Sequence, residues 1–371
     1  MERISPFLEP RDYPAIAAVL APSAPVDIGE LLSELETDTV IKILKYLPAD
    51  ITGEIMTYLD PDLAPEILSA LGEVKGSAIL DSMNLDDVAD ILGELEPTEQ
   101  NALLDMMEDE DAEDVRELMV YPEDTAGSIM TIEYVSLRKN MTVSDALTRI
   151  RRTGVDKETI YTCYVTDYNK KLLGLVTAKD LLLSEEDTEI IDIMQTNLIY
   201  AQTHTDKEEV SQMFSKYDLL ALPVVDDEER LVGIVTVDDA LDVMEEEATE
   251  DIEKMAAIVH VDKPYLQTSV WETYKSRIPW LLLLMISATF TGMIITGFED
   301  ALSVSIVLSA CIPMLMDTGG NCGGQASVTI IRALSLNDIE FRDIFKVIWK
   351  ELRVGVLCGA SLAIEIGRAS C

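Results

Sequence analysis

The sequence has few of the residues that build zinc sites and disulfide frameworks. Its 371 residues include five cysteines and two histidines, and no two cysteines have the CxxC spacing. A zinc site or a disulfide scaffold is therefore not expected, and a reducing compartment is expected around the soluble part. The N-terminal stretch MERISPFLEPRDY also lacks the apolar region of a signal peptide.

Positive charge is scarce as well. The chain has 28 Lys and Arg against 69 Asp and Glu, a net charge of −41, and −40 of this falls in residues 1–270. Such a surface repels nucleic acid and anionic headgroups and attracts cations, so no nucleic-acid partner is expected. The alternative explanation is that these charges serve solubility alone. The sequence has no nucleophile paired with a base, no P-loop and no metal-hydrolase motif. The chain is therefore not expected to be an enzyme.

Apolar residues recur every twelve positions in the N-terminal third. Two phases of this register, three residues apart, share one helical face. Turn and N-cap signals such as LPAD, LDPD and LEPTE separate the repeats. The pattern predicts short helices that must stack because none can bury its face alone. The register comprises Leu44, Leu47, Met56, Leu59, Leu68, Leu71, Leu80, Met83, Leu92, Leu95, Leu104, Met107 and Met119.

A second pattern repeats at an offset of 59 residues. YVTDYNKKLLGLVTAKDLL, residues 164–182, aligns with PVVDDEERLVGIVTVDDAL, residues 223–241. Each copy predicts a strand, a turn, a second strand and a helix that opens at Thr-x-x-Asp. Two copies with this ending resemble a tandem pair of CBS domains. CBS pairs often bind adenine nucleotides, and the resemblance makes Thr177, Asp180, Thr236 and Asp239 candidates for that role.

Carboxylates form a stripe on the helix predicted after residue 237. Asp239, Asp242 and Glu246 share a face at helical spacing, and Glu247, Glu250 and Asp251 lie beside them. Like charges at this spacing weaken a helix, and a bridging cation would remove that penalty. A solvated face that needs no ligand is the alternative.

The apolar segments of the last hundred residues predict membrane spans. LLLLMISATFTGMIITGF is long enough to cross a bilayer, and a short acidic connection leads to ALSVSIVLSACIPMLM. Lys and Arg flank this pair only before the first span and after the second, so the positive-inside rule places the acidic part in the cytoplasm. A third apolar stretch near Val354 is too short for a complete span.

A polar stripe interrupts the second span. Asp317, Asn321 and Gln325 are four residues apart and share one helix face, among four glycines. Polar groups at membrane depth have no lipid partner for hydrogen bonding, so a glycine-rich polar segment there must be buried in protein or line a water-filled cavity. The stripe therefore predicts either a permeation surface or a packing contact between helices.

Four features in order resemble one family. The acidic helical repeats, the CBS pair ending in VDDALDVMEEEATEDI, the RxPWLL entry to the first span and the GGNxGxQ segment followed by IIRALS are similar to MgtE magnesium transporters or channels. This resemblance implies a homodimeric Mg²⁺ channel in the lipid of the inner (plasma) membrane, multi-pass, with a large cytoplasmic N-terminal part. It also implies that Mg²⁺, the transported ion, regulates the channel from the cytoplasm by bridging the N-domain, the CBS domains and a plug helix. Some members also bind ATP as a regulator.

The resemblance carries over residue by residue. The implied Mg²⁺ ligands are Glu54, Asp86, Asp90, Glu208, Asp218, Asp239, Asp242, Glu247, Glu250 and Asp251, and the pore candidates are Asp317, Asn321 and Gln325. Members of the family have five spans, so a C-terminally truncated form is expected here. Such a form would sense magnesium without conducting it.

The expected fold class is a multidomain membrane protein. It combines an all-α helical-repeat N-domain, an α+β tandem CBS pair, a long plug helix and an incomplete α-helical transmembrane region. The expected boundaries are 1–130, 131–195 and 196–244 for the N-domain and the two CBS domains, 245–270 for the plug helix, and 271–371 for the membrane part, with spans near 279–297, 301–330 and from 346.

Two other functions stay open. One is a membrane-tethered CBS sensor of adenine nucleotides, in which the spans only anchor. The other is a transporter of a different divalent cation such as Co²⁺, Mn²⁺ or Ni²⁺. The lack of histidine near the spans disfavours a site selective for softer metals.

Overall fold

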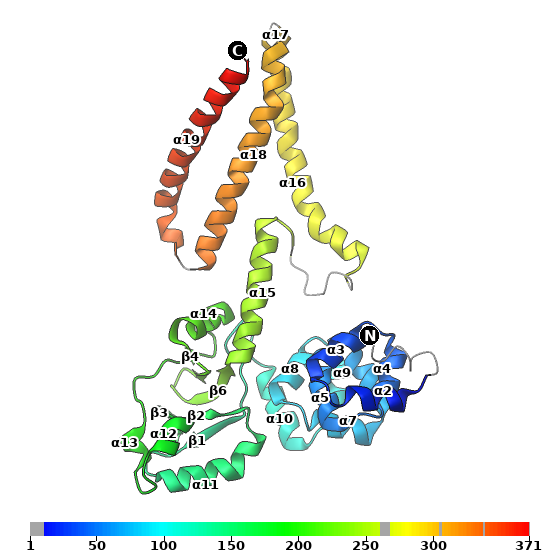
Figure 1. The fold of residues 1–371 in the computed structure, drawn as a ribbon, viewed down its shortest axis with the longest axis vertical. Helices are drawn as coiled ribbons and strands as arrows, with labels where there is room; N and C mark the ends of the chain where they lie inside the picture. The colour runs from blue at the N-terminus through cyan, green and yellow to red at the C-terminus, as the bar shows by residue number, and fades with distance from the viewer. Residues whose placement is uncertain (1–10, 260–267, 304–305, 337, 371) are drawn as a thin grey trace. The chain divides into compact units, whose positions relative to one another are not determined.

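A computed structural model of the chain describes residues 11–259, 268–303, 306–336 and 338–370 (Figure 1). The first ten residues, where a signal peptide was not expected, lie outside these ranges. The chain forms two compact units, Met1–Met244 and Glu245–Cys371. The first contains the helical repeats and both CBS domains, and the second contains the long apolar helices.

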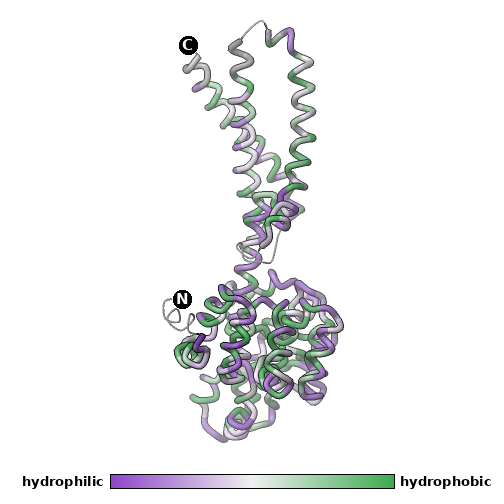
Figure 2. Tube along the Cα trace, turned by 90° about the vertical axis from the view of Figure 1, so that its right-hand side faces the viewer, coloured by the Kyte–Doolittle hydropathy of each residue, from purple (hydrophilic) through white to green (hydrophobic). Residues whose placement is uncertain are grey.

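The N-terminal repeats are short helices, as the sequence predicts. They stack so that α3 packs on α5 and α5 on α7, with α2 on α4 and α4 on α6. In Figure 2, hydrophobic and hydrophilic residues alternate along these helices. The elements are α2 (Tyr13–Leu20), α3 (Pro25–Ser33), α4 (Thr37–Leu44), α5 (Ala49–Met56), η1 (Pro61–Leu63), α6 (Ala64–Leu71), α7 (Glu73–Leu80), α8 (Leu85–Gly93), α9 (Pro97–Leu104) and α10 (Asp109–Leu118).

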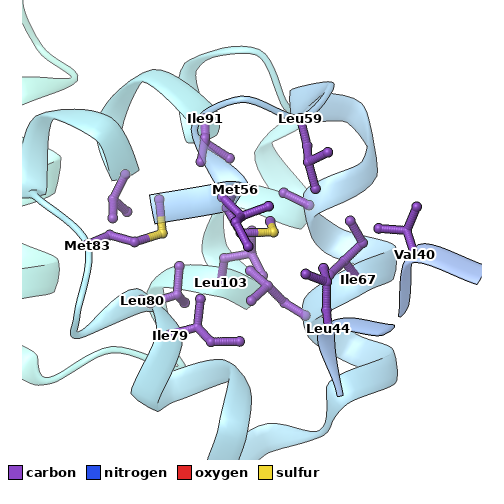
Figure 3. Packing of buried hydrophobic residues seen from close by; sticks show 14 of the residues in the cluster. Val40, Leu44, Met56, Leu59, Ile67, Ile79, Leu80, Met83, Ile91 and Leu103 are labelled. Atoms are coloured by element: carbon purple, nitrogen blue, oxygen red, sulfur yellow. The ribbon is translucent and has the colours of Figure 1, made fainter. Parts of the chain in front are cut away.

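One core runs through this helical array. All residues of the twelve-residue register are buried in it or, for Leu71 and Met119, partly buried against it, so the predicted register is confirmed. Side chains from successive helices, among them Leu44, Met56 and Leu80, point into the same interior (Figure 3). Because each helix is only eight to ten residues long, its stability comes from this shared burial.

The two CBS domains have the same strand topology. Each sheet has three strands, the first parallel and the third antiparallel to the central one. The sheets are β1 (Tyr134–Leu137), β2 (Thr159–Thr166) and β3 (Leu172–Thr177), then β4 (Ala201–Gln202), β5 (Ala221–Val225) and β6 (Leu231–Thr236). The helices are α11 (Val143–Thr153), η2 (Gly154–Asp156), α12 (Ala178–Leu183), α13 (Ile190–Ile193) and α14 (Lys207–Tyr217).

Equivalent glycines let a linker cross each sheet at close range. A Cβ on Gly233 would lie 2.9 Å from the Thr131 carbonyl oxygen, and one on Gly174 would lie 3.0 Å from that of Gln195. Beside these glycines, Ile234 exchanges two backbone hydrogen bonds of 2.8 Å with Thr131. The glycine of the GxVT motif is therefore needed for close backbone approach.

A continuous helix, α15 (Val237–Met255), begins where β6 ends. The plug helix was expected at 245–270, whereas α15 already begins at Val237 and ends at Met255. Residues 260–267 of the expected range lie outside the described residues. The second unit also contains α16 (Val270–Gly297), α17 (Glu299–Ser303), α18 (Ile306–Ser335), η3 (Phe341–Asp343) and α19 (Ile344–Ser370).

Among the described residues, α16 is the one helix that is both long enough and apolar enough to cross a membrane. It has 28 residues and a mean hydropathy of 2.0 over its most apolar window. The first expected span lies within α16, most of the second within α18, and the third within α19. The polar stripe lowers the hydropathy of α18, and lysines and arginines lower that of α19.

The glycine contact leads to a stability prediction. We expect Gly233→Ala to destabilise the first unit by about 1–3 kcal/mol, because the new methyl group would overlap the Thr131 carbonyl and the Met130 side chain. Gly93→Ala is the control, since no atom lies within 4 Å of a Cβ there. Thermal unfolding followed by circular dichroism compares the two variants. A melting temperature for Gly233→Ala equal to that of Gly93→Ala would disprove the close contact.

Candidate functional site

Seven acidic side chains gather where the helical array meets the CBS pair. Four elements contribute them: α8, the segment before β1, the segment before β2, and the first turn of α15. Their mutual electrostatic repulsion is felt across these elements, for example between Asp87 and Asp239 and between Glu158 and Asp86. This carboxylate cluster consists of Asp86, Asp87, Asp90, Glu133, Glu158, Asp238 and Asp239.

Two helix N-termini bring much of this charge together. Asp86 and Asp87 lie in the first turn of α8, and Asp238 and Asp239 lie in the first turn of α15. A helix N-terminus carries free N–H groups and a partial positive charge, which stabilises carboxylates at that position. Each acidic turn is thus locally favourable, although the two repel each other.

Apolar packing holds α8 against the CBS pair despite this repulsion. Leu85 and Ala89 of α8 pack against the core of the helical array and also against the core of the second CBS domain. Leu118, at the end of α10, is buried in that second core. Burial of these apolar side chains therefore keeps α8 in contact with the CBS pair, although the carboxylates on both sides repel each other.

Burial and like charge raise the pKa values of the cluster. The pKa of Asp87 and that of Glu158 both rise to about 7, first because of burial and then because of the neighbouring carboxylates. Burial also raises the pKa of Asp239 to about 6, against the lowering effect of the Thr236 hydroxyl. The pKa of Asp86 is raised by burial, with a smaller contribution from the repulsion of Glu133. The cluster therefore favours binding positive charge, whether a proton or a cation.

Asp86 has an unmet hydrogen-bonding requirement. Its side chain is largely buried, and Oδ1 has no hydrogen-bond partner. A buried carboxylate oxygen without a partner is costly unless water or a cation contacts it. Within the described ranges, no three acidic, His or Cys side chains are arranged to hold one metal ion directly.

The structure brings three of the predicted Mg²⁺ ligands together, namely Asp86, Asp90 and Asp239. Glu54 lies exposed on α5. Glu208 and Asp218 lie at opposite ends of α14, where Asp218 has the left-handed conformation. These three remain predictions.

The remaining predicted ligands follow α15. Asp242 is exposed on its proximal part. In the second unit, Glu250 pairs with Lys254 at 2.7 Å, and a carboxylate oxygen of Asp251 lies 4.0 Å from a guanidinium nitrogen of Arg332. Glu247 is on the same helix. Their role in ion binding stays a prediction.

The residues predicted to bind nucleotide have local structural roles. The Thr177 hydroxyl donates to Asp180 at 2.7 Å, and the Thr236 hydroxyl donates to Asp239 at 2.5 Å. At Thr177 a complete capping box opens the following helix. The two halves differ in charge beside this motif, where Lys179 of the first corresponds to Asp238 of the second.

The pore candidates share one exposed face of α18. Asp317, Asn321 and Gln325 are four residues apart within this continuous helix, and all three are exposed. The glycines between them have no neighbouring atom within 4 Å of a Cβ position. The structure is compatible with either role that the sequence leaves open for this stripe.

Sequence reasoning missed four members of the cluster. Asp87 and Asp238 each adjoin a predicted ligand, and their place in an acidic first helical turn was a usable signal. Glu133 and Glu158 lie far from α8 in sequence, and no local pattern marks them. Only the fold brings these two to α8.

Sequence profiles match most of the chain. Residues 23–124 match the MgtE intracellular N domain, and residues 126–186 and 190–246 match CBS domains. Residues 312–370 match a profile described as a divalent cation transporter. The order of these matches is the order expected from the sequence.

Individual relatives support the same assignment. The chain is 34% identical over 364 residues to the magnesium transporter MgtE of Bacillus subtilis, an alignment that covers 97% of this chain and 79% of that protein. It is 43% identical over 250 residues to the magnesium transporter MgtE of Thermus thermophilus. This second alignment covers 67% of this chain but only 56% of the relative.

Solved structures resemble the soluble part. One is the cytosolic domain of the Mg²⁺ channel MgtE in complex with ATP, with a TM-score of 0.62 and 38% identity, covering 65% of this chain and 98% of that one. Another is the soluble part of a magnesium transporter, with a TM-score of 0.60 and 29% identity, covering 66% and 96%.

The raised pKa values predict a pH dependence in the absence of divalent cations. The pKa values of Asp87 and Glu158 are about 7 in the folded unit and about 4 in an unfolded chain, so the folded unit binds more protons between these limits. We therefore expect the first unit to lose stability as pH rises from about 4 through about 7. Melting temperatures measured in chelator from pH 5 to 8 test this.

The double variant Asp87→Asn, Glu158→Gln removes the two titrating groups while keeping polar side chains. Its melting temperature should vary less with pH than that of the wild type. An identical pH profile in the variant would assign the effect to other groups.

Proposed function

Because the chain belongs to the MgtE family of magnesium transporters, we propose that it is a subunit of a Mg²⁺ transporter or channel regulated by cytoplasmic Mg²⁺ at the carboxylate cluster. The observation that carries the proposal is the position of the cluster, between the helical array and the start of α15. The family consists of divalent cation transporters and not of enzymes, in agreement with the prediction.

The chemistry of the cluster suits Mg²⁺. This ion is hard, prefers oxygen ligands and gives up its water reluctantly, so it binds through a few carboxylates and several waters. Asp86, Asp87 and Asp90 from α8, with Asp239 from α15, would hold the hydrated ion.

Regulation would follow from differential binding. A cation between α8 and α15 offsets the repulsion of their acidic first turns and favours the docked arrangement of the helical array. Loss of the ion leaves the buried carboxylates to repel each other. Since α15 is one helix from Val237 to Met255, a displacement at the cluster would alter its distal part, where Glu247, Glu250 and Asp251 are further candidate ligands.

The wider assignments belong to this proposal. The assembly would be a homodimer in the lipid bilayer, with the acidic part in the cytoplasm and Asp317, Asn321 and Gln325 along the ion path. Transport of another divalent ion, such as Co²⁺ or Mn²⁺, is the alternative, and the oxygen-only donor set of the cluster favours Mg²⁺.

A second function is supported by the charge difference between the CBS halves. We infer that an adenine nucleotide binds as a regulator beside Thr177 and Asp180, where Lys179 can pair with a phosphate. At Thr236 and Asp239, the polyphosphate would instead meet Asp238 and the rest of the cluster. A solved relative carries ATP.

Neutralising one carboxylate tests the Mg²⁺ proposal. The wild-type chain should be more resistant to protease in millimolar Mg²⁺ than in chelator, beyond the effect of K⁺ at equal ionic strength. Asp87→Asn should reduce this difference, because it removes both a candidate ligand and part of the repulsion. The control is Glu99→Gln, which removes the same charge from the exposed first turn of α9. An undiminished Mg²⁺ effect in Asp87→Asn would remove the cluster from the sensor.

Charge reversal tests the nucleotide site. Lys179→Asp gives the first half the residue found in the second half, and we expect about a tenfold loss of ATP affinity in equilibrium binding. Lys139→Asp makes the same charge change at an exposed position and should leave affinity unchanged. Equal affinities for both variants would argue against the inferred site.

A further inference from the structure

The N-terminus of α8 is capped by a residue from another domain. Asn84, at the N-cap position, has an extended backbone and its side chain makes no capping hydrogen bond. The N–H group of Leu85 instead donates to a carboxylate oxygen of Glu133 at 3.3 Å, across 48 residues of sequence. Glu133 therefore accepts from one of the N–H groups at the start of α8 that have no partner within the helix.

The segment that carries Glu133 is tied to β6. Thr131, which is fully buried, exchanges two 2.8 Å backbone hydrogen bonds with Ile234 in β6. The close approach at Gly233 leaves little room for this segment to shift. Two residues after Ile234, β6 ends at Thr236, whose hydroxyl holds Asp239 in the first turn of α15.

These contacts form a continuous connection from α8 to α15. It runs from the α8 N-terminus through Glu133 and Thr131 into β6, and then into the first turn of α15. It is independent of any contact between the acidic side chains themselves.

The cap forms against electrostatic repulsion. The carboxylates of Glu133 and Asp86 repel each other at the α8 N-terminus. A cation that neutralises Asp86 removes this repulsion and strengthens the bond from Leu85 to Glu133. By thermodynamic linkage, a well-formed cap equally favours cation binding.

We propose that Glu133 is a positioning residue that couples cation occupancy of the carboxylate cluster to the contact between α8 and the CBS pair. This proposal rests on the Mg²⁺ regulation proposed above. Glu133 acts as a hydrogen-bond acceptor for α8, and its negative charge opposes docking when no cation is present. The acceptor and the charge can therefore be separated by substitution.

The test measures hydrogen–deuterium exchange of the full chain in detergent, with overlapping peptides that resolve the Leu85 amide, across a Mg²⁺ titration. Glu133→Ala should expose the Leu85 amide in both chelator and Mg²⁺, and should raise the Mg²⁺ concentration for half-maximal protection of α8 severalfold. Glu133→Gln keeps an acceptor without the charge. It should retain Leu85 protection, with a half-maximal Mg²⁺ concentration at or below that of the wild type.

Glu96→Ala is the matched control. Glu96 is the N-cap residue of α9 and its side chain makes no capping hydrogen bond, so exchange and Mg²⁺ response should match the wild type. Wild-type exchange at Leu85 in Glu133→Ala would overturn the proposal. Equal impairment in Glu133→Gln would also overturn it, because the charge would then serve as an ion ligand.

The outcomes separate this proposal from the one on which it rests. If the wild type shows no Mg²⁺ response, the regulatory function fails and the coupling role fails with it. If the wild type responds and both Glu133 variants respond identically to it, only the coupling role fails. Should Glu133→Ala lose its helical circular dichroism, Glu133→Gln still decides between acceptor and charge.

Discussion

Repulsion between two acidic helix N-termini is the constraint on which the first unit depends. The first turns of α8 and α15 each carry two aspartates, and Glu133 and Glu158 add charge around them. Apolar contacts of Leu85 and Ala89 hold α8 in place against this repulsion. A balance of this kind responds to small changes in bound charge, because opposing contributions nearly cancel. Regulation by a cation needs such a balance.

Helix α8 belongs to the helical array and also contacts the second CBS domain. The array has a single continuous core, to which residues from nearly every helix contribute. Leu85 and Ala89 link that core to the core of the second CBS domain. Because the short helices are stable only when stacked, α8 is held in the array by the same core that it helps to build.

The two CBS halves share one topology but differ in charge beside the same motif. Both sheets have the same strand order, and both third strands end at a threonine whose hydroxyl binds the aspartate three residues later. The residue before that aspartate is Lys179 in one half and Asp238 in the other. A positive charge suits a phosphate, and an aspartate within the carboxylate cluster suits a cation. Fold and capping contact are shared, so the two halves differ in charge at this one position.

The sequence by itself determined the features that have a local period or a repeat. These are the twelve-residue register, the paired CBS motifs, the apolar span in α16 and the acidic turns with Asp86 and Asp239. Only the tertiary structure decided that Glu133 and Glu158 join this site. Helical and strand periodicity reports which residues share a face within one element. Which faces meet depends on chain topology and on apolar packing between distant segments, and the spacing of charged residues along the sequence does not encode this.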